Sequence, residues 1–596
     1  MASERSTVNK EDDKVALVEV REAHSSIRPF TWGQLRSRVA LFSAALQASG
    51  VQVGDRVAVV MGNSIDTLCV FLGATALGAL FSSSSTDMGP KGILERLRQI
   101  EPKFVFVDDA AVYNGKRVDL RDKMKDLISG MTNVKEFKAL ISVPRFDTPL
   151  DVTSIPQVTT LKSFLTSSPT PVPPLSFNRV PFAAGFLIVY SSGTTGTPKC
   201  IVHSVGGVLL GGFKEGSLHR EIGPSSTALQ FTTTGWIMYL AAVQTLLFGA
   251  KLIMYDGSPF LPKVDSFLQL AASQGVTHLG VSPRYFSTLQ RAGIVPKKIK
   301  GLETLRIVTS TGMVLPTSLF HWFYSPIGFH PTTHLANISG GTDIAGGFGD
   351  CNALLPVYSS GGCQAMSLGV EVRVYDSTIE GQTENDVPAG KELPVGEPGD
   401  LVAVKPFPNM PIHFWGDKGN RKYHDAYFKR FDNVWTHGDF IYIDPATHAV
   451  VFLGRADGVL NPSGVRFGSA EIYSVLESGF PDEIEDSICV GRRRKGDNDE
   501  AVMLFLKLKP GKKFEKGLVK RIKEKIGQEL SKRHVPKFVF ETKEIPTTVN
   551  GKKVELPVKR IVNGEVVKPS GTLANPESLK YYERFVSVEE GERSKL

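Results

Sequence analysis

The sequence predicts an α/β fold, with a large N-terminal domain of mixed and parallel α/β subdomains followed by a small mobile α+β C-terminal domain. Amphipathic helical segments alternate with short apolar segments at residues 31–109 and again at 186–310, which is the pattern of βαβ units and a largely parallel sheet. The chain has 596 residues, more than one hydrophobic core supports. Its composition changes after Gly454, so we place the domains at 1–456 and 457–596.

The first elements follow from hydrophobic periodicity and from end signals. The segment 31–50 (TWGQLRSRVALFSAALQASG) predicts an amphipathic helix closed by Gly50. We interpret the apolar stretches Leu68–Phe81 and Trp236–Phe248 as buried helices, because both are too short to span a membrane. The other elements expected in this region are a buried strand at 55–63, helices at 64–79 and 91–100, and a strand at 103–109.

The alternation resumes after a Pro/Ser-rich loop at 167–174. FLIVY at 186–190 is a continuous apolar run, and three further strands are expected at 251–256, 276–282 and 304–310. In the C-terminal domain we expect a helix at 469–478, strands at 487–491 and 501–508, and a helix near 516–532 whose apolar stripe contains Leu518, Ile522, Ile526 and Leu530. A large and a small domain together predict a cleft with a moving lid.

Composition argues against several classes of function. The balance of 41% hydrophobic and 22% charged residues is typical of a soluble globular protein, and a net charge of +8 without a basic face interleaved with aromatics disfavours nucleic-acid binding. The five cysteines show no C-x-x-C spacing, which favours a reducing compartment and disfavours structural zinc. The N-terminus is polar, unlike a secretory signal. The basic run 492–495 (RRRK) fits a solvated turn and a contact for an anionic ligand equally well.

The segment Tyr190–Lys199 (YSSGTTGTPK) directly follows the apolar run at 186–190. Its glycines allow the backbone to approach a phosphate, its hydroxyls and amides donate hydrogen bonds, and Lys199 supplies positive charge. It differs from the P-loop, because Lys199 lies three residues after Gly196 and is followed by Cys200. A flexible linker is poorly compatible with the Pro-Lys ending and the preceding strand, so we interpret this segment as a phosphate-binding loop.

YSSGTTGTPK resembles the phosphate-loop signature of the adenylate-forming superfamily of acyl-CoA synthetases, luciferases and peptide-synthetase adenylation domains. Segments resembling the superfamily's other signatures follow in the same order: NISGGTDIAG (337–346), VWTHGDFIYID (434–444), GRADGVLNPSGVRFGSAEIYSVLE (454–477) and PTTVNGKK (546–553). The resemblance covers about residues 30–580. Within the superfamily, the segments TTTGWIMYL, YDGSP, HLGVSPRY, SGGTDI and NGKKVELPVKR are most similar to acetoacetyl-CoA synthetases.

The resemblance implies an ATP-dependent acid:CoA ligase that forms an acyl-adenylate and then an acyl-CoA thioester, with ATP, Mg²⁺ and coenzyme A as cofactors and co-substrates. Acetoacetate is the expected acid and lipid metabolism the expected context; another short or medium oxo- or branched-chain acid is the alternative. The nucleotide site that it implies contains Ser191, Ser192, Gly193, Thr194, Thr195, Gly196, Lys199, Gly312, Asn337, Thr342, Asp439, Arg455 and Arg466.

Each implied catalytic residue has a chemical role. When a carboxylate attacks the α-phosphate two anions meet, so Lys552 is expected to bridge them. Arg455 and Arg466 are expected on the phosphate and ribose side, and Asp439 on the ribose hydroxyls. A hard cation prefers carboxylate and phosphate oxygens, so Asp343 is the expected Mg²⁺ ligand, where many relatives have Glu. The catalytic residues are then Thr195, Asp343, Arg466 and Lys552.

The resemblance also implies an acyl pocket and a domain rotation. Acetyl-CoA synthetases close their pocket with a tryptophan where this chain has Gly340, which we expect to leave room for a longer acid. The pocket residues expected are Trp236, Ile237, Met238 and Gly340. Asp457 maps to the hinge, and after rotation the segment through Gly464 would face the thiol while Lys552 withdraws. We expect the N-terminal leader typical of acetoacetyl-CoA synthetases to be absent.

The chain ends in Ser594-Lys595-Leu596, and a terminal S-K-L is an address read by the peroxisomal import receptor. We therefore expect a peroxisomal location, with the cytosol as the alternative. Two other classes of function are less favoured. No carrier-type domain follows Lys552, which disfavours an adenylation domain that feeds a carrier protein, and the intact motif residues disfavour an inactive binding protein.

Overall fold

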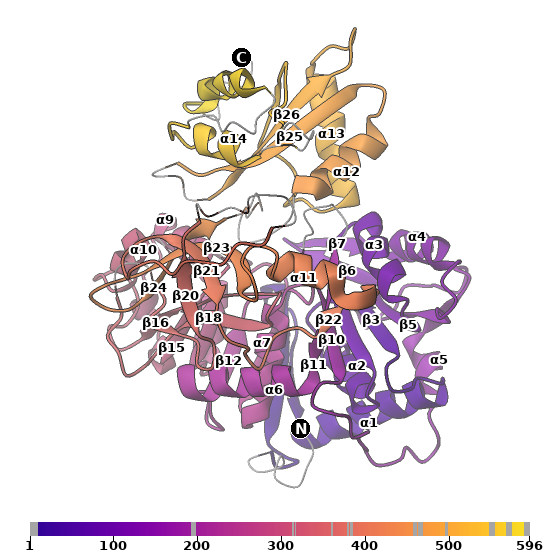
Figure 1. Cartoon of the computed structure of the whole chain (residues 1–596). Coiled ribbons are helices and arrows are strands. Elements are labelled where there is room, and N and C mark those ends of the chain that lie inside the picture. The colour runs from indigo at the N-terminus through magenta and orange to yellow at the C-terminus, as the bar shows by residue number, and fades with distance from the viewer. Residues whose placement is uncertain are drawn as a thin grey trace. The chain divides into compact units, whose positions relative to one another are not determined.

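The computed structural model divides the chain into two compact units, whose elements are labelled in Figure 1. Unit 1 comprises Met1–Thr86, Ile93–Tyr190 and Cys200–Gly454, and unit 2 comprises Asp87–Gly92, Ser191–Lys199 and Arg455–Leu596. No helix in the described part of the chain is long and apolar enough to cross a membrane. The structure describes residues 10–191, 198–312, 315, 317–358, 362–377, 379, 381, 386–456, 460, 462, 469–494, 497, 499–547, 553, 555–567 and 575–588.

A seven-stranded sheet, sheet A, forms one part of unit 1. Neighbouring strands pair parallel, except that β2 is antiparallel to β1. Strand β12 lies between β13 and β14, so the strand order reverses there, and open α/β sheets bind ligands at the carboxyl ends of strands at such a point. The order is β16 (His334–Asn337), β15 (Ile307–Ser310), β14 (His278–Val281), β12 (Thr227–Gln230), β13 (Lys251–Asp256), β1 (Val15–Arg21) and β2 (Ile27–Thr31).

An eight-stranded sheet, sheet B, forms the second part of unit 1. Its strands from β10 to β9 pair parallel, while β22 pairs antiparallel with β11. The order is β22 (His413–Phe414), β11 (Lys199–Ser204), β10 (Gly185–Ser191), β4 (Leu80–Ser84), β3 (Arg56–Val60), β5 (Phe104–Asp108), β8 (Ala139–Val143) and β9 (Val158–Thr160). The predicted α/β class with parallel sheets is therefore confirmed.

One predicted helix is too long. The stretch Leu68–Phe81 was expected to be helical throughout, but helix α2 (Ile65–Ala76) ends early, and β4 then begins at Leu80. Gly78 has a φ of +76° and its N–H donates to the carbonyl of Thr75, so a left-handed glycine ends the helix. The second apolar stretch becomes helix α7 (Met238–Gln244), which continues as a 3₁₀ turn at Thr245–Phe248.

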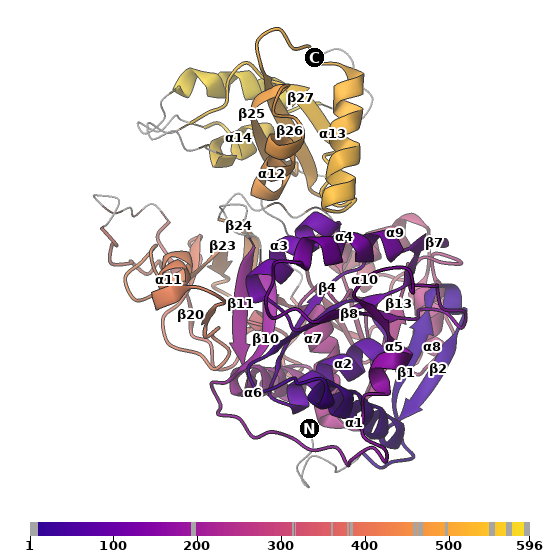
Figure 2. The ribbon, with the colours of Figure 1, turned by 90° about the vertical axis from the view of Figure 1, so that its right-hand side faces the viewer.

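Helices cover both faces of sheet A. Residues of α1 (Trp32–Ala48), α2 and α7 share one hydrophobic core with sheets A and B, and α1 begins at Thr31 in a capping box with Gln34. The other face of sheet A packs on α8 (Ser266–Ser273), α9 (Pro283–Arg291) and α10 (Thr317–Phe323). Helices α3 and α4 lie side by side (Figure 2), and the Arg98 side chain in α3 donates to the Gly130 carbonyl in α4. The remaining helices here are α3 (Pro90–Ile100), α4 (Arg121–Met131), α5 (Leu161–Leu165) and α6 (Val205–Lys214).

The third part of unit 1 is built from small sheets with antiparallel pairs. Helix α11 (Arg421–Tyr427) packs on the four-stranded sheet, sheet E, through a core that contains Phe414, Tyr427 and Trp435. Its strands are β20 (Val372–Tyr375), β21 (Gly399–Ala403), β23 (Trp435–Ile443) and β24 (Val450–Arg455). Beside it lies a three-stranded sheet of β17 (Ser339–Gly341), β18 (Gly346–Asp350) and β19 (Ala365–Met366). A separate hairpin of β6 (Ala110–Tyr113) and β7 (Lys116–Asp119) follows β5, and the N–H groups in its turn donate to Glu22, next to β1.

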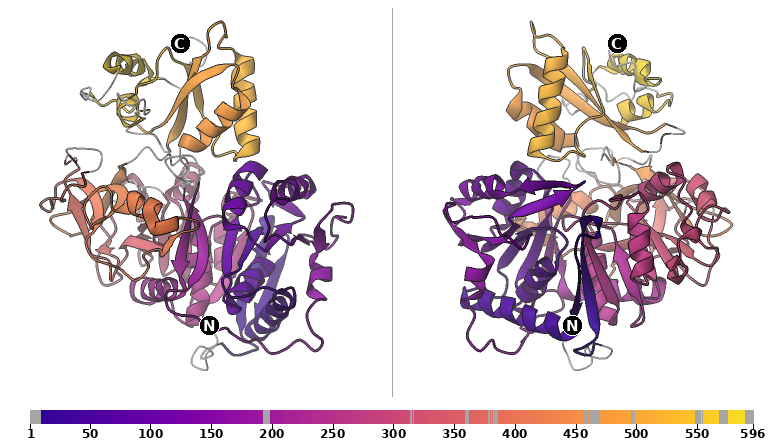
Figure 3. Two further views of the ribbon diagram at one scale, coloured as in Figure 1. Left: turned by 45° about the vertical axis from the view of Figure 1, so that its right-hand side comes forward. Right: turned by 180° about the vertical axis from the view of Figure 1, so that it is seen from behind.

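Unit 2 contains a sheet that is buried on both faces. Along β26 the side chains alternate, because Val502, Leu504 and Leu506 share a core with α12 and α13, whereas Met503 and Phe505 share a core with α14 and the C-terminal 3₁₀ helix η9. The two helical layers are visible on either side of the strands in Figure 3. The elements are β25 (Ile484–Arg492), β26 (Ala501–Leu508), β27 (Phe538–Glu541), α12 (Ser469–Gly479), α13 (Lys516–Glu529), α14 (Glu555–Val562) and η9 (Pro576–Phe585).

The last described segment packs with a three-residue period. Leu579, Tyr582, Phe585 and Val588 are all buried, as expected for a helix with three residues per turn. Arg492 is buried too, and its guanidinium donates to the carbonyls of Phe585 and Val588 at 3.3 and 2.8 Å. The first arginine of the basic run is therefore the buried end of β25 and not part of a solvated turn. It fastens the C-terminal segment to the sheet.

Candidate functional site

The hairpin of β17 and β18 carries Thr342 and Asp343 in its turn. Its two strands are mostly glycine, and Gly340 pairs with Gly347. A Cβ added at Gly340 would lie 2.7 Å from the Cα of Gly347 and still closer to the backbone of Gly346. Glycine is therefore needed here for the close approach of the two strands.

This geometry changes the meaning of Gly340. From the sequence, we expected the absence of a side chain at Gly340 to leave room for a longer acid. The structure shows that the direction of that side chain is filled by the backbone of β18, so a tryptophan could not be added without moving the strand. The assignment of Gly340 to the acyl pocket stays a prediction.

Two side chains from other elements hold the hairpin turn. His203 in β11 donates from Nε2 to the carbonyl oxygen of Thr342 at 3.0 Å. Burial lowers the pKa of His203 to about 4, so the imidazole is neutral at physiological pH. The Tyr427 hydroxyl donates to Oδ1 of Asp343 at 2.6 Å. The first bond fixes the backbone of the turn, and the second fixes its carboxylate.

Strand β23, which carries Asp439, runs beside the β17–β18 hairpin. Gly438 has a φ of +79°, and the pairing of β23 with β21 shifts register there, so a bulge precedes Asp439. His437 lies 3.7 Å from the Asp439 carboxylate, and both side chains are buried. A Cβ added at Gly341 would lie 2.7 Å from Nε2 of His437, which places this histidine directly against β17.

Two further residues that are predicted to bind the nucleotide, Asn337 and Gly312, lie at the carboxyl edge of sheet A. Ser310 and Asn337 are paired at the ends of β15 and β16, and the N–H of Ile338 donates to the carbonyl of Ser310. Gly312 follows with a φ of +94°. Asn337 and Gly312 therefore lie after adjacent strand ends, where open α/β sheets place their ligand sites.

The predicted acyl-pocket residues follow β12, the strand at which the order of sheet A reverses. The Thr234 hydroxyl donates to the carbonyl of Met61, and the Ser83 hydroxyl donates to the carbonyl of Thr234, so this loop joins the carboxyl ends of both large sheets. It leads into α7 through Trp236 and Ile237, which are half-buried. Met238, the first residue of α7, is buried.

The predicted phosphate loop lies mostly outside the described residues. Ser191 ends β10 and Lys199 begins β11, whereas Ser192, Gly193, Thr194, Thr195 and Gly196 are not described. The motif's first residue is Tyr190, whose hydroxyl accepts a hydrogen bond from the Ser82 hydroxyl at 2.7 Å, and the Arg96 guanidinium lies 5.3 Å from its ring centre.

In unit 2, Asp457, Gly464, Arg466 and Lys552 also lie outside the described residues, and Arg455 is the last residue of β24. Near Lys552, the structure describes Thr547, Lys553 and the residues from Glu555 to Val567. Thr547 and Lys553 pair across the loop, and Lys553 forms a 2.7 Å ion pair with Asp486. Just beyond, Glu555 accepts hydrogen bonds from the Ser469 and Tyr473 hydroxyls at 2.5 and 2.7 Å. Lys553, the residue that follows Lys552, is thus held by described residues of unit 2.

A magnesium ion fits what the structure offers at Asp343. Mg²⁺ in nucleotide sites takes one or two carboxylates together with phosphate oxygens and water. The described residues contain no group of three or more His, Cys, Asp or Glu that could hold a metal alone. One carboxylate, oriented by Tyr427, is suited to an ion that is shared with a phosphate.

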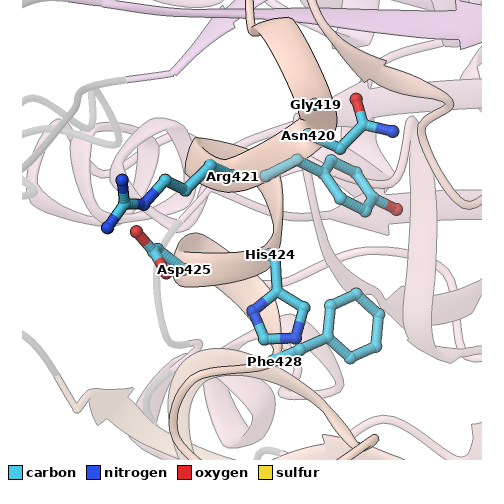
Figure 4. Close-up of a pocket in the computed structure, with 7 residues that line it drawn as sticks. Gly419, Asn420, Arg421, His424, Asp425 and Phe428 are labelled. Atoms are coloured by element: carbon cyan, nitrogen blue, oxygen red, sulfur yellow. The ribbon is translucent and has the colours of Figure 1, made fainter. Parts of the chain in front are cut away.

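A hollow of about 530 Å³ opens beside α11 (Figure 4), and none of the predicted site residues lines it. The His424 and Phe428 rings stack there, with their centres 5.9 Å apart. The residues that line the hollow are Gly419, Asn420, Arg421, Tyr423, His424, Asp425 and Phe428.

The sequence interpretation missed His203 and Tyr427, the two residues that hold the hairpin turn. His203 lies four residues after Lys199, but Tyr427 lies 84 residues from Asp343, and no spacing signal joins them.

Comparison with known proteins gives a consistent result. Residues 4–408 match the model of the AMP-binding enzyme family. The chain is 40% identical over 583 residues to acetoacetyl-CoA synthetase of Gallus gallus, which covers 98% of this chain and 84% of that protein. It is 37% identical to malonamoyl-CoA synthetase vrtB of Penicillium aethiopicum, covering 97% and 79%. The solved structure of acetoacetyl-CoA synthetase from Streptomyces lividans is similar, with a TM-score of 0.70, 34% identity, and coverage of 97% and 85%.

Proposed function

The chain belongs to the AMP-binding enzyme family and is an ATP-dependent acid–CoA ligase of the acetoacetyl-CoA synthetase type, and on this premise we propose that its acid is acetoacetate or a close 3-oxo analogue. The similarity over 98% of the chain to a protein named acetoacetyl-CoA synthetase carries this choice. The relative named malonamoyl-CoA synthetase points to the same chemical class. Acetoacetate and malonamate both carry a carbonyl on the third carbon, and they differ in a terminal methyl or amino group.

The reaction has two steps. In the first, a carboxylate oxygen of the acid forms a bond to the α-phosphorus of ATP, and the bond to the β-phosphate bridging oxygen breaks, so that pyrophosphate leaves. In the second, the sulfur of coenzyme A attacks the acyl carbonyl, AMP leaves, and the thiol proton is released. Both steps collect negative charge, which the site must neutralise.

Several residues of this chain support the first step. Lys199 and the loop 192–197 would bind phosphates, Thr342 would contact the nucleotide, and Lys552 would lie between the attacking carboxylate and the α-phosphate. Mg²⁺ would be held by Asp343 and by phosphate oxygens, and it would neutralise part of their charge. Asp439 would accept hydrogen bonds from the ribose hydroxyls. Arg455 and Arg466 would lie on the phosphate and ribose side.

We further propose that domains 1–456 and 457–596 rotate about Asp457 between the two steps. Lys552 is needed only for adenylation, and the thiol needs access to the same carbonyl, so one arrangement cannot serve both steps well. The segment through Gly464 would then face the thiol.

A panel of short acids tests the assignment. ATP-dependent consumption of coenzyme A is measured with acetoacetate, malonamate, butyrate, 3-hydroxybutyrate and acetate. A site that hydrogen-bonds the 3-oxo group discriminates strongly against butyrate, which lacks it. The proposal expects acetoacetate or malonamate to have the highest kcat/KM. An equal or higher kcat/KM for butyrate would contradict it.

For the location, we propose import into peroxisomes through Ser594, Lys595 and Leu596. The support is the sequence: from Ser587 to Lys595 it has no apolar residue other than Val588, so it offers little to bury. A fluorescent protein fused to the N-terminus should coincide with a peroxisomal marker, and the same fusion without residues 594–596 should be diffuse. Diffuse fluorescence of the intact fusion would favour the cytosol.

A further inference from the structure

Tyr427 joins the hairpin turn to a different sheet. It is the last residue of α11, it is buried, and its hydroxyl donates to Oδ1 of Asp343 at 2.6 Å. A hydrogen bond between a hydroxyl and a carboxylate at this distance is charge-assisted and strong. Nothing in the family resemblance assigned a role to this residue.

The position of the Tyr427 ring is fixed by sheet E. The ring stacks on that of buried Trp435, with centres 3.8 Å apart and planes 15° apart. Phe414 and Tyr423 meet it edge-on at 5.6 and 5.3 Å. Since aromatic contacts on both the face and the edges restrict the ring, its hydroxyl is held in one place.

The backbone of Asp343 is held separately from its carboxylate. It lies in a short turn between two glycine-rich strands, and Ala345 in that turn has a strained φ of +46°. The backbone of the turn is held by His203 on Thr342 and by the Asn409 amide, which donates to the carbonyl of Ile344 at 2.8 Å. These bonds act on the backbone of the turn, whereas the bond from Tyr427 acts on the Asp343 carboxylate itself and favours one orientation of it.

Trp435 also begins the strand that carries Asp439 four residues later. The stack therefore ties the proposed metal-binding carboxylate to the proposed ribose-binding strand. We propose that Tyr427 is a positioning residue for adenylation: it holds Asp343 in the orientation in which Mg²⁺ and ATP bind together. This inference rests on the proposed function, and it adds a residue that acts through Asp343 without touching substrate.

Tyr427→Phe tests the proposal, because it keeps the stacked ring and removes the hydroxyl. Tyr423→Phe is the matched control: Tyr423 lies in the same helix and aromatic group, and its hydroxyl donates to the carbonyl of Pro411 at 2.9 Å. Two quantities are measured on the full chain. The first is the gain in ATP affinity that Mg²⁺ gives, by calorimetry without acid. The second is thioester formation from supplied acyl-adenylate, which does not need Mg²⁺·ATP.

We expect Tyr427→Phe to reduce the Mg²⁺-dependent gain in ATP affinity and the rate of pyrophosphate exchange by about tenfold or more, since hydrogen bonds to charged groups contribute roughly 1.5–3 kcal/mol. Thioester formation from acyl-adenylate should stay within about twofold of the parent, and Tyr423→Phe should match the parent in both assays. An unchanged Mg²⁺-dependent gain, or an equal loss in both half-reactions, would overturn the proposal.

A cycle with Asp343→Asn separates positioning from packing. If Tyr427 acts through the carboxylate, Tyr427→Phe should have no further effect on ATP affinity in the Asp343→Asn background. A loss that persists there would show a packing defect and would overturn the proposal. The parent chain distinguishes failure of this proposal from failure of the proposed function. If the parent shows no pyrophosphate exchange with any acid of the panel, the proposed function fails, whatever the Tyr427 variants show.

Discussion

The ammonium of Lys553 lies 4.1 Å from the centre of the Tyr473 ring, and the Tyr473 hydroxyl donates to Glu555 at 2.7 Å. The residue that follows the proposed adenylation lysine is thus clamped between an aromatic face and Asp486, while Glu555 is tied to α12. Burial raises the pKa of Glu555, and the two hydroxyl donors oppose that rise. These bonds fix the chain at Lys553 and Glu555, directly after Lys552 in the sequence.

Lys552→Ala should abolish adenylation and largely spare thioester formation from supplied acyl-adenylate, because the charge of Lys552 is needed only in the first step.

Lys553→Gln should slow adenylation by roughly three- to tenfold, since the contacts of Lys553 with Asp486 and the Tyr473 ring, about 1 kcal/mol, are lost. The two half-reactions are measured separately. The control is Lys507→Gln, which removes a surface ion pair with Glu485 in the same unit. Equal losses in both half-reactions would contradict these roles.

His203 should matter through one hydrogen bond. His203→Leu leaves the carbonyl of half-buried Thr342 without this donor and facing an apolar side chain, so adenylation should fall by about tenfold or more. His203→Gln places an amide N–H near the position of Nε2 and should recover most of the activity. Steady-state kcat and KM for ATP decide the matter. Equal activity of the Leu and Gln variants would show that the hydrogen bond is not what counts.

Gly340→Ala should destabilise unit 1 without changing the choice of acid. The added Cβ meets the backbone of β18, and forcing such an overlap costs roughly 1–3 kcal/mol or more. The matched control is Gly223→Ala, where an added Cβ has no heavy atom within 4 Å. Thermal unfolding gives the stability, and the ratio of kcat/KM for acetoacetate and acetate gives the selectivity. A shift of that ratio with an unchanged Tm would restore the pocket interpretation.

Asp108 should make the stability of unit 1 depend on pH. Burial raises the pKa of Asp108 from 3.8 to about 7, against the opposing effect of Arg145. Between these values the folded chain keeps a proton that the unfolded chain has lost, so this contribution to stability falls as pH rises toward 7. The amide in Asp108→Asn does not ionise, so the variant lacks this pH dependence. Its Tm relative to the parent should therefore rise between pH 5 and pH 8, by the equivalent of about 2 kcal/mol. A constant difference would contradict the raised pKa.

Much of the fold could be predicted because its elements carry their own signals. The helices at 32–48 and 516–529 have amphipathic stripes, and the apolar run of β26 is buried, as are Leu187 and Ile188 in that of β10. The position of β12 between β13 and β14 could not be predicted, since strand order depends on packing between distant segments. The end of α2 was missed because Gly78 was not interpreted as a C-terminal cap.

The site divides in the same way. Asp343 and Asp439 lie in motifs that can be recognised from local sequence. Tyr427 and His203, which hold the turn around Asp343, approach it only through the packing of α11 and β11. Gly340 shows the opposite case. Its identity was noticed, but the reason for it, the close approach of β18, is a property of the folded hairpin.

The most direct test of the central claim is acetoacetate-dependent exchange of labelled pyrophosphate into ATP, measured with Mg²⁺ and without coenzyme A. Exchange requires that the acid and ATP form an enzyme-bound adenylate and release pyrophosphate reversibly. The account predicts exchange that depends on both acetoacetate and Mg²⁺ and that is lost in Lys552→Ala. Folded protein that shows no exchange with any acid of the panel would contradict it.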